Sequence, residues 1–287
     1  MTGRSGAGGS LVLVATPIGN LGDLSARARD VLGSADLVCC EDTRRTRILL
    51  SASGLPSNPR RLVSLHGHNE LARIPEVLEH LRAGETVAVV SDAGTPAISD
   101  PGRRLVAAAV AEGFVVTAVP GPSSVLMAMS VSGLDCDRFS FEGFLPRKGG
   151  DRQRRLGALA GEERTAVVLE APGRVAQLLT DLAAVCGDRP VAVCRELTKL
   201  HEEVWRGSLG DAVAAFADRE VLGEVVVVLG GAGPPEKPGD AAIASAVEER
   251  LAAGDTPRQA ADSVAAALGV ARRRAYSIAI EQRDNTG

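Results

Sequence analysis

The stretch TVAVVSDAGTPAISDPGRRLVAAAVAEGFVVTAV, residues 86–119, decides the fold class of this chain. Its two ends, Thr86–Ser91 and Val115–Val119, are short apolar runs that are typical of buried strands. Between them lie a loop rich in glycine and proline and a helical stretch, Pro101–Glu112, which begins with a proline and is followed by Gly113. A strand, a helix and a second strand at this spacing predict a βαβ unit in a mainly parallel sheet.

The same alternation continues on both sides of this unit and predicts two consecutive α/β blocks, joined by the segment 120–135. The further strands that we expect are Leu11–Thr16, Asp36–Cys40, Arg61–Leu65, Phe139–Gly143, Ala166–Glu170, Val191–Arg195, Val204–Ser208 and Val225–Leu229. The further helices that we expect are Ser25–Leu32, Thr43–Ser53, Asn69–Arg82, Val175–Val185 and Leu209–Asp218.

The strand signal ends at a linker rich in glycine and proline, GGAGPPEKPG (230–239). Helical stretches follow, and a glycine turn with three consecutive arginines in the last of them suggests a helix-turn-helix. A solvated helical tail is the alternative. The stretches are Ala241–Ala253, Thr256–Leu268 and Ala271–Gln282. The whole pattern predicts a flexible tail over residues 1–10, α/β domains over 11–122 and 123–232, and a helical, helix-turn-helix-like segment over 240–287.

The composition disfavours several classes of protein. Only 2% of the residues are aromatic, which argues against a nucleic-acid binder built on rows of stacking aromatics. The net charge of −4 argues against a broad, non-specific binder of polyanions. The five cysteines form no CxxC pair, so we expect reduced structural thiols. No run reaches the roughly 18 apolar residues of a membrane helix, and the start has no apolar signal core, so we expect a cytoplasmic protein.

Loops that follow the expected strands combine glycine or proline with small polar residues. Ligands of an open parallel sheet bind beyond the carboxyl ends of its strands, so these loops are candidate binding elements. The most distinctive loop, SDAGTPAISDPG (91–102), is longer and more constrained than an ordinary βα turn. In it, Asp92 is placed to accept hydrogen bonds from a ribose or an amine. Turn chemistry is the alternative, with Asp100 capping the next helix.

The other loops are TPIGNLGD (16–23), EDTR (41–44) and PGPSS (120–124). The first matches neither a dinucleotide fingerprint nor a P-loop. In the other two, the hydroxyl and carboxylate side chains either cap the following helix or contact a ligand. His66 and His68 have too few further ligands nearby to predict a metal site, so we expect no metal. No GxSxG pattern supports hydrolase chemistry.

Several motifs occur in a fixed order along the chain. They are ATPIGNLGDLSARA (15–28), EDTRRT (41–46), LHGHNE (65–70), VSDAGTPAISDPG (90–102), VPGPSS (119–124), DRFSFEGFLPRK (137–148), CRELTK (194–199) and GEVVVV (223–228). In this order they resemble the tetrapyrrole methylase superfamily, which binds S-adenosylmethionine, and within it the ribosomal RNA branch. VSDAGTP with FEGFLPRK separates this branch from the cobalamin and sirohaem enzymes.

The resemblance implies a two-domain α/β fold, with a parallel Rossmann-like sheet, a second mixed α/β domain and a small helical C-terminal tail. It implies a homodimer that methylates the ribose 2′-hydroxyl of a cytidine in 16S rRNA, in the decoding centre of the small ribosomal subunit. S-adenosylmethionine would lie in the cleft between the domains. The residues expected to bind it are Pro17, Ile18, Gly19, Asp92, Gly94, Thr95, Ile98, Ser123, Ser124, Leu169, Glu170, Ala171 and Glu224.

Alignment of the ribose hydroxyl with the methyl group can supply much of the acceleration. Because a ribose hydroxyl is a poor nucleophile, a base, or a charge that stabilises the alkoxide, is expected to help as well. The candidates for this role are Glu41, Asp42, Glu170, Arg195, Glu196 and Lys199, and the sequence does not choose among them. The residues expected to contact RNA phosphates are Arg147, Lys148, Arg152, Arg154, Arg155, Arg272, Arg273 and Arg274. For the run between residues 147 and 155, a solvated loop is the alternative.

Two other functions stay open on the sequence. A methyltransferase of the same fold acting on a small tetrapyrrole would be active without ribosomes and would not need the basic tail. A non-catalytic nucleotide-binding module on the ribosome would bind the cofactor without transferring its methyl group.

Overall fold

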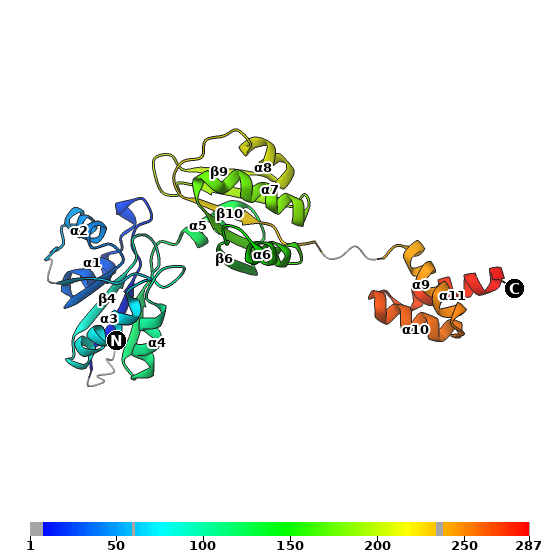
Figure 1. Ribbon diagram of the computed structural model, residues 1–287, viewed down its shortest axis with the longest axis horizontal. Coiled ribbons are helices and arrows are strands. Elements are labelled where there is room, and N and C mark those ends of the chain that lie inside the picture. The colour runs from blue at the N-terminus through cyan, green and yellow to red at the C-terminus, as the bar shows by residue number, and fades with distance from the viewer. Residues whose placement is uncertain (1–7, 59–60, 234–237, 287) are drawn as a thin grey trace. The chain divides into compact units, whose positions relative to one another are not determined.

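The computed structural model describes residues 8–58, 61–233 and 238–286. The chain divides into two compact units, one ending at Gly231 and the other beginning at Ala232. The first unit contains two five-stranded sheets with their helices, and the second unit consists of helices (Figure 1).

The first sheet has five parallel strands in the order β3-β2-β4-β1-β5, which confirms the predicted parallel sheet. Its strands are β1 (Ser10–Val14), β2 (Leu37–Cys40), β3 (Leu62–Ser64), β4 (Thr86–Val90) and β5 (Val115–Val119). The helical segments that connect them are η1 (Leu21–Asp23), α1 (Ala26–Ser34), α2 (Thr43–Ala52), α3 (Glu70–Arg82) and α4 (Arg103–Ala111).

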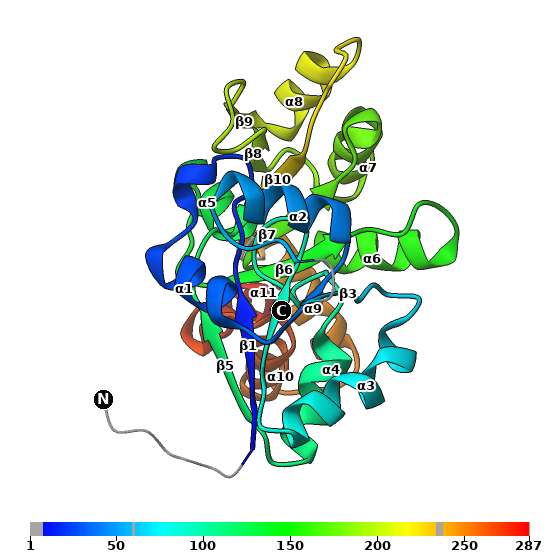
Figure 2. The same cartoon turned by 90° about the vertical axis from the view of Figure 1, so that its left-hand side faces the viewer.

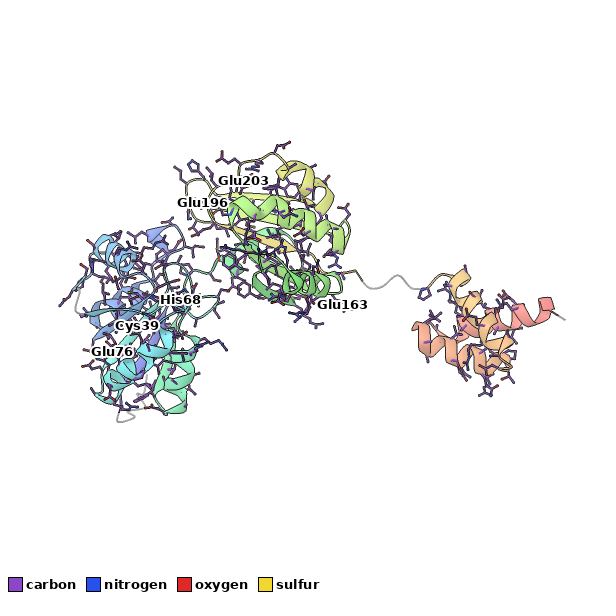
Figure 3. The ribbon with its side chains drawn as sticks, in the orientation of Figure 1. Cys39, His68, Glu76, Glu163, Glu196 and Glu203 are labelled. Atoms are coloured by element: carbon purple, nitrogen blue, oxygen red, sulfur yellow. The ribbon has the colours of Figure 1, made fainter. Side chains whose placement is uncertain are left out.

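Helices cover both faces of this sheet, which explains why its central strands are continuously apolar. Successive strand residues point to opposite faces: Val12 packs in a core with α1 and α2, whereas Leu11 packs in a core with α3 and α4. The neighbouring cysteines divide between the same two cores, Cys40 in the first and Cys39 in the second. Cys39 is labelled in Figure 3. Burial raises the pKa of the Cys39 thiol to about 12, so this cysteine is an inert core side chain.

Strand β1 begins inside the segment 1–10, which the sequence predicts to be a flexible tail. The Gly9 N–H donates to the Leu81 carbonyl at 2.7 Å, and the Ser10 N–H donates to the Glu85 carbonyl at 3.1 Å. A Cβ on Gly9 would collide with the Glu85 carbonyl, so the close approach requires glycine. The prediction is therefore wrong for residues 9 and 10, and residues 1–7 lie outside the described residues.

The second sheet is mixed, in the order β6-β7-β10-β8-β9, with β6 and β7 parallel and the other pairs antiparallel. This confirms the mixed second domain. Its strands are β6 (Phe139–Phe144), β7 (Thr165–Glu170), β8 (Pro190–Arg195), β9 (Glu203–Ser208) and β10 (Val225–Leu229). Its helical segments are α5 (Ser124–Ser132), α6 (Gly150–Ala160), η3 (Pro172–Arg174), α7 (Val175–Cys186) and α8 (Leu209–Phe216).

Two helices of this sheet, α5 and α6, are absent from the elements expected on the sequence. Helix α5 forms inside the segment expected to join the two blocks, and its Ala128 and Met129 pack against one face of the second sheet. Helices α6, α7 and α8 cover the opposite face, where Leu156, Leu178 and Phe216 belong to one continuous core (Figure 2).

The second unit contains α9 (Asp240–Ala252), α10 (Pro257–Leu268) and α11 (Arg272–Thr286). Thr256 and Gln259 form a capping box at the start of α10, and Gly269 ends this helix in the left-handed conformation. Its small core includes Ile243 and Val264. No helix in the part of the chain that the structure describes is long and apolar enough to cross a membrane.

Candidate active site

A cavity of about 380 Å³ lies between the loops that follow the first sheet's strands and the strand ends of the second sheet. This position agrees with the rule that ligands of open parallel sheets bind beyond the carboxyl ends of the strands. The first sheet's side contributes Ile18, Glu41, Arg45, Asp92, Ala93, Gly94, Thr95, Ile98, Ser99, Asp100, Ser123, Ser124 and Val125. The second sheet's side contributes Phe141, Phe144, Leu169, Glu170, Ala171, Pro172, Gly223, Glu224, Val225 and Val226.

The loops after β1 and β4 are joined into one backbone frame. The Thr16 N–H donates to the Gly94 carbonyl at 2.9 Å, and the Gly94 N–H donates to the Thr16 carbonyl at 3.1 Å. The buried Thr16 hydroxyl donates to the Ser91 carbonyl at 3.2 Å. Gly94 has a φ of +83°, a backbone conformation that glycine adopts without the strain another residue would bear, so glycine favours this turn of the loop beside Ile18.

The part of the β4–α4 loop that enters the cavity has an unusual backbone. Ala97 and Ser99 adopt φ values of 67° and 64°, in the left-handed region that non-glycine residues rarely occupy. Ser99 packs against β6, where a Cβ on Gly143 would lie 3.2 Å from the Ser99 Oγ. Such backbone conformations cluster at functional sites, and here they place Ile98, Ser99 and Asp100 in the cavity wall.

Three carboxylates lie at the first sheet's side of the cavity. The Asp92 Oδ1 accepts from the Asp42 N–H at 3.1 Å, and its Oδ2 pairs with Arg45 at 3.3 Å. Burial, together with the charge of Asp92, raises the pKa of Glu41. Burial, together with the charge of Glu41, raises the pKa of Asp100 to about 6. This end of the cavity therefore contains a carboxylate whose protonation changes near neutral pH.

The alternative that Asp100 caps α4 is wrong, because Glu70 occupies that place. The Glu70 Oε1, on α3, accepts three backbone N–H groups at the start of α4, at 3.1, 2.8 and 3.2 Å. In the same motif, the Asn69 Oδ1 accepts from the His66 N–H at 2.7 Å. The LHGHNE motif thus braces the first domain. Among the described residues, no cluster of His, Cys, Asp and Glu could hold a metal ion.

The structure confirms the helix-capping alternative for the PGPSS loop, whereas contact of its hydroxyls with a ligand stays a prediction. The Ser123 Oγ caps α5 by accepting from the Leu126 N–H at 3.4 Å, and Ser123 and Ser124 also line the cavity. The Thr95 hydroxyl donates to the Pro122 carbonyl at 3.2 Å, which ties this loop to the loop after β4.

On the second sheet's side, Glu170 ends β7 with a side chain that is 0% exposed. Its Oε1 accepts from the Ala171 N–H at 2.8 Å and pairs with Arg174. Its Oε2 has no hydrogen-bond partner among the described residues. Buried polar atoms are nearly always partnered, so this oxygen in the cavity wall calls for a donor from a ligand.

Most residues that the sequence predicts to bind the cofactor line this cavity, but Pro17 and Gly19 do not. Gly19 instead lies against Lys199, whose side chain would collide with a Cβ at that position. The prediction missed Arg45, Ser99, Asp100, Phe141, Phe144 and Gly223. A sequence signal existed for the two phenylalanines, which lie inside the DRFSFEGFLPRK motif.

Of the six candidates for the base or charge, only Glu41 and Glu170 line the cavity. Asp42 caps α2 and binds Arg44, which holds the pKa of Asp42 well below its usual range. Arg195 on β8 pairs at 3.1 Å with Glu203 on the edge strand β9; Glu203 is labelled in Figure 3.

The remaining two candidates, Glu196 and Lys199, form a network behind the cavity wall. The Lys199 Nζ lies 2.8 Å from the Glu196 Oε1 and 3.4 Å from the Glu224 Oε2. The Glu196 Oε1 also accepts from the Glu224 N–H at 3.0 Å, and the hydrogen bond from Lys199 lowers the pKa of Glu196. Glu196 and Thr198 adopt left-handed φ values of 51° and 67°. The network positions Glu224, which does line the cavity.

The basic run expected to contact RNA is largely neutralised by carboxylates. Arg152 has a side chain only 11% exposed, and it joins α6 to α7 by pairing with Asp181 at 2.6 Å. Arg155 pairs with Glu142, and Arg154 pairs with Asp151. Arg152 thus braces two helices, and its contact with RNA stays a prediction. Arg147 and Lys148 form no ion pair with any residue that the structure describes.

In the tail, Arg272 pairs with Asp262 and Arg274 pairs with Asp240 at 2.7 Å. Arg273 is exposed and has no ion pair among the described residues. Of the three consecutive arginines, it is the one whose charge is not already paired within the described residues.

A parallel doubly wound sheet, a mixed second sheet and a ligand cavity between their strand ends define a two-domain α/β enzyme. Residues 10–213 match the family model described as Tetrapyrrole (Corrin/Porphyrin) Methylases. The chain belongs to this family of methylases, whose methyl donor is S-adenosylmethionine.

Relatives and solved structures agree with this assignment. The chain is 47% identical to Ribosomal RNA small subunit methyltransferase I of Mycobacterium tuberculosis, over 97% of both chains. It is 44% identical to the protein of the same name from Synechocystis, over 95% of this chain and 98% of that one. Uroporphyrin-III C-methyl transferase from Thermus thermophilus, complexed with S-adenyl homocysteine, has a TM-score of 0.55 at 23% identity, over 78% of this chain and 97% of that chain.

Proposed function

We propose that this chain transfers the methyl group of S-adenosylmethionine to the 2′-hydroxyl of a cytidine in 16S rRNA, in the decoding centre of the small ribosomal subunit. The observation that carries the proposal is the 47% identity, over 97% of both chains, with a protein named as a small-subunit rRNA methyltransferase. The similarity to uroporphyrin-III C-methyl transferase, at 23% identity, supports the fold alone.

The cavity's volume of about 380 Å³ and its acceptor groups suit a ligand of the size and polarity of S-adenosylmethionine. The cofactor carries amino and hydroxyl donors, and the buried Glu170 Oε2 is an acceptor without a partner among the described residues. Gly94 keeps the loop backbone close to Ile18, and Leu169 and Val226 supply apolar walls for an adenine ring. When bound, the cofactor supplies a methyl group that is already activated for attack by an oxygen nucleophile.

The chain's own residues would align the ribose hydroxyl with that methyl group and exclude water. Alignment of two reactants supplies a large part of a rate enhancement, up to about 7–11 kcal/mol. The stiff loop containing Ala97 and Ser99 and the brace from Glu70 hold one wall, and the network around Glu196 holds the other. Phe141 and Phe144 line the cavity wall. Both belong to the motif DRFSFEGFLPRK, which continues to Arg147.

The unpaired cations Arg147 and Lys148 are the best candidates for contacts to RNA phosphates. We predict that Arg147→Gln with Lys148→Gln lowers the affinity for small subunits about tenfold or more and flattens its salt dependence by about one unit of slope for each lost contact. The measurement is a salt series of filter-binding titrations. The matched control is Arg154→Gln, which removes a charge already paired with Asp151 and is expected to change affinity less. Equal effects of the two variants, or no change in RNA affinity, would contradict the prediction.

The proposed reaction is tested by transfer of a radiolabelled methyl group to small subunits from a strain that lacks the modification. We expect the label in 16S rRNA, on one cytidine ribose, as mapped by nuclease digestion. Label only in an added tetrapyrrole would support the small-molecule alternative, and cofactor binding without transfer would support the non-catalytic one. Sedimentation of the same preparation tests the implied homodimer. The affinity of Arg273→Gln for small subunits, measured by the same filter-binding titrations, tests whether the tail contacts RNA.

A further inference from the structure

The carboxylates of the cavity differ in whether a cation already neutralises them. Asp92, Glu170 and Glu224 each pair with an arginine or a lysine. Glu41 accepts a hydrogen bond from the Asp92 backbone and lies near Arg45. Asp100 makes no ion pair with any residue that the structure describes, and no arginine or lysine contributes to its electrostatic environment. Among the carboxylates of the cavity wall, Asp100 is therefore the one whose charge is least compensated.

Asp100 is also released from the structural role that its position suggests. An aspartate directly before a helix commonly caps it, which is the place of Asp100 relative to the helix expected at Pro101–Glu112. Here Glu70 accepts the N–H groups at the start of α4, and the residue at the N-cap position is Gly102. The left-handed backbone of Ala97 and Ser99 then places the next side chain, Asp100, in the cavity wall. The loop thus maintains a strained conformation and presents to the cavity a carboxylate that does not cap α4 and whose neighbouring hydrogen-bond donor is the neutral Ser91 hydroxyl.

A separate observation indicates that a ligand fills this cavity. Glu170 lies on the second sheet's side, its side chain is 0% exposed, and its Oε2 is without a partner among the described residues. Buried acceptors are usually partnered, so a donor of a bound ligand that reached this oxygen would satisfy it. If the methyl donor binds against Glu170, the carboxylates on the first sheet's side of the cavity are free to contact the methyl acceptor.

Building on the proposed function, we infer that Asp100 is the catalytic base that takes the proton of the ribose hydroxyl during methyl transfer. In this step the O–H bond breaks and its proton goes to an Asp100 oxygen, while the hydroxyl oxygen forms a new bond to the methyl carbon. The carbon–sulfur bond breaks, and its electron pair stays on the sulfur. The positive charge of the sulfonium and the negative charge of the carboxylate disappear together, so charge balances, and Asp100 then returns its proton to water.

The electrostatic environment suits this role. The pKa of Asp100 is about 6, chiefly because of burial and because of the Glu41 charge, so the group is mostly ionised at neutral pH and is a stronger base than an ordinary aspartate. Below about pH 6 the carboxylate is protonated and the rate is expected to fall. The charged groups that face Asp100 or its neighbours are Glu41 after β2, Asp92 after β4, Arg45 on α2, His66 after β3 and Glu70 on α3.

The test compares Asp100→Asn with wild type in single-turnover methylation of small subunits at saturating cofactor, from pH 5 to pH 8.5. We expect a rate loss of about 100-fold or more, with the affinity for S-adenosylhomocysteine within about threefold of wild type by calorimetry. Asp100→Glu is expected to recover part of the rate. The matched control is Asp30→Asn, an exposed aspartate of α1, which is expected to keep the wild-type profile.

Glu41→Gln gives a readout that a merely structural role of Asp100 would not change. Removal of the neighbouring charge is expected to lower the pKa of Asp100, so the acid limb of the rate profile moves to lower pH. Carbon-13 NMR of labelled aspartate, without cofactor, should show a carboxyl that titrates near pH 6, is missing in Asp100→Asn and is shifted in Glu41→Gln.

The outcomes separate this inference from the proposed function. If wild type labels no RNA, the proposed function fails and the inference fails with it. If wild type is active and Asp100→Asn keeps its rate within threefold, only the inference fails. If the variant instead binds S-adenosylhomocysteine more than tenfold more weakly and regains its rate at saturation, Asp100 is a cofactor ligand and the inference is overturned.

Discussion

Replacement of Glu70 by alanine is expected to lower the free energy of unfolding by about 2–3 kcal/mol, because it removes a charged acceptor from three buried or partly buried N–H groups. Glu70 is only 6% exposed, so water cannot take its place without a rearrangement. Its negative charge also lies at the N-terminus of α4, where the helix dipole favours an anion. A side chain 32 residues before Gly102 in the chain thus fixes the end of the loop that lines the cavity.

The same change is expected to weaken cofactor binding about tenfold, since the loop 91–102 would lose its anchor at α4 and about 1.4 kcal/mol corresponds to a tenfold change. Denaturant unfolding measures the first effect and calorimetry with S-adenosylhomocysteine measures the second. Hydrogen exchange should show faster exchange at the amides of Arg104 and Leu105, which donate to Glu70.

Glu79→Ala is the matched control for Glu70→Ala. Glu79 lies on the same helix α3, but its side chain is 73% exposed and it forms a surface ion pair with Arg82. Pairs of this kind contribute about 0–1 kcal/mol, so only a small loss of stability and no change in cofactor affinity are expected. If the two variants were equally stable, the three hydrogen bonds to Glu70 would not be a significant anchor.

Local sequence pattern is sufficient to predict the parallel sheet and most of the cavity, because both depend on strands and on the loops that follow them directly. Apolar runs such as Thr86–Val90 are buried on both faces, and their carboxyl ends necessarily meet at one edge. The pattern therefore predicts that Asp92 and Gly94 lie near Ile18, and all three line the cavity. The cavity residues on the second sheet's side, including Glu170, are predicted from the resemblance to the methylases and not from local pattern.

Other features depend on contacts between distant residues, which no local pattern records. The sequence offers Asp100 as a candidate helix cap, but the N–H groups at the start of α4 are bound by Glu70 from another helix. Arg152 lies in a run of basic residues, but Asp181, 29 residues away, neutralises it. In both cases the missing information is the identity of a partner, and not the propensity of the residue itself.

Helix α5 escapes prediction for a different reason. Its sequence, SVLMAMSVS, does not divide into an apolar and a polar face, so it carries no helical periodicity. The structure explains this composition: Ala128 and Met129 pack into the second sheet's core, while Leu126 is 56% exposed. A short apolar run of this kind cannot be assigned to helix or strand by pattern alone.

Replacement of Gly223 by alanine is expected to weaken cofactor binding strongly. Gly223 lines the cavity with a φ of +85°, and a Cβ there would collide with the Glu196 carboxylate. That carboxylate holds both the Glu224 N–H and Lys199, so Gly223→Ala must displace the network that positions Glu224. Gly113→Ala is the matched control, because Gly113 has a similar φ of +80° but nothing within 4 Å of an added Cβ.

Both alanines would bear the strain of the left-handed conformation, about 1–2 kcal/mol, so both variants should lose a similar amount of stability from this source. Only Gly223→Ala should also weaken binding of S-adenosylhomocysteine, by about tenfold or more, which corresponds to about 1.4 kcal/mol. Calorimetry on the two purified variants measures the difference. Equal dissociation constants would show that the Glu196 network does not shape the cofactor site, and the strained backbone at Glu196 and Thr198 would then need another explanation.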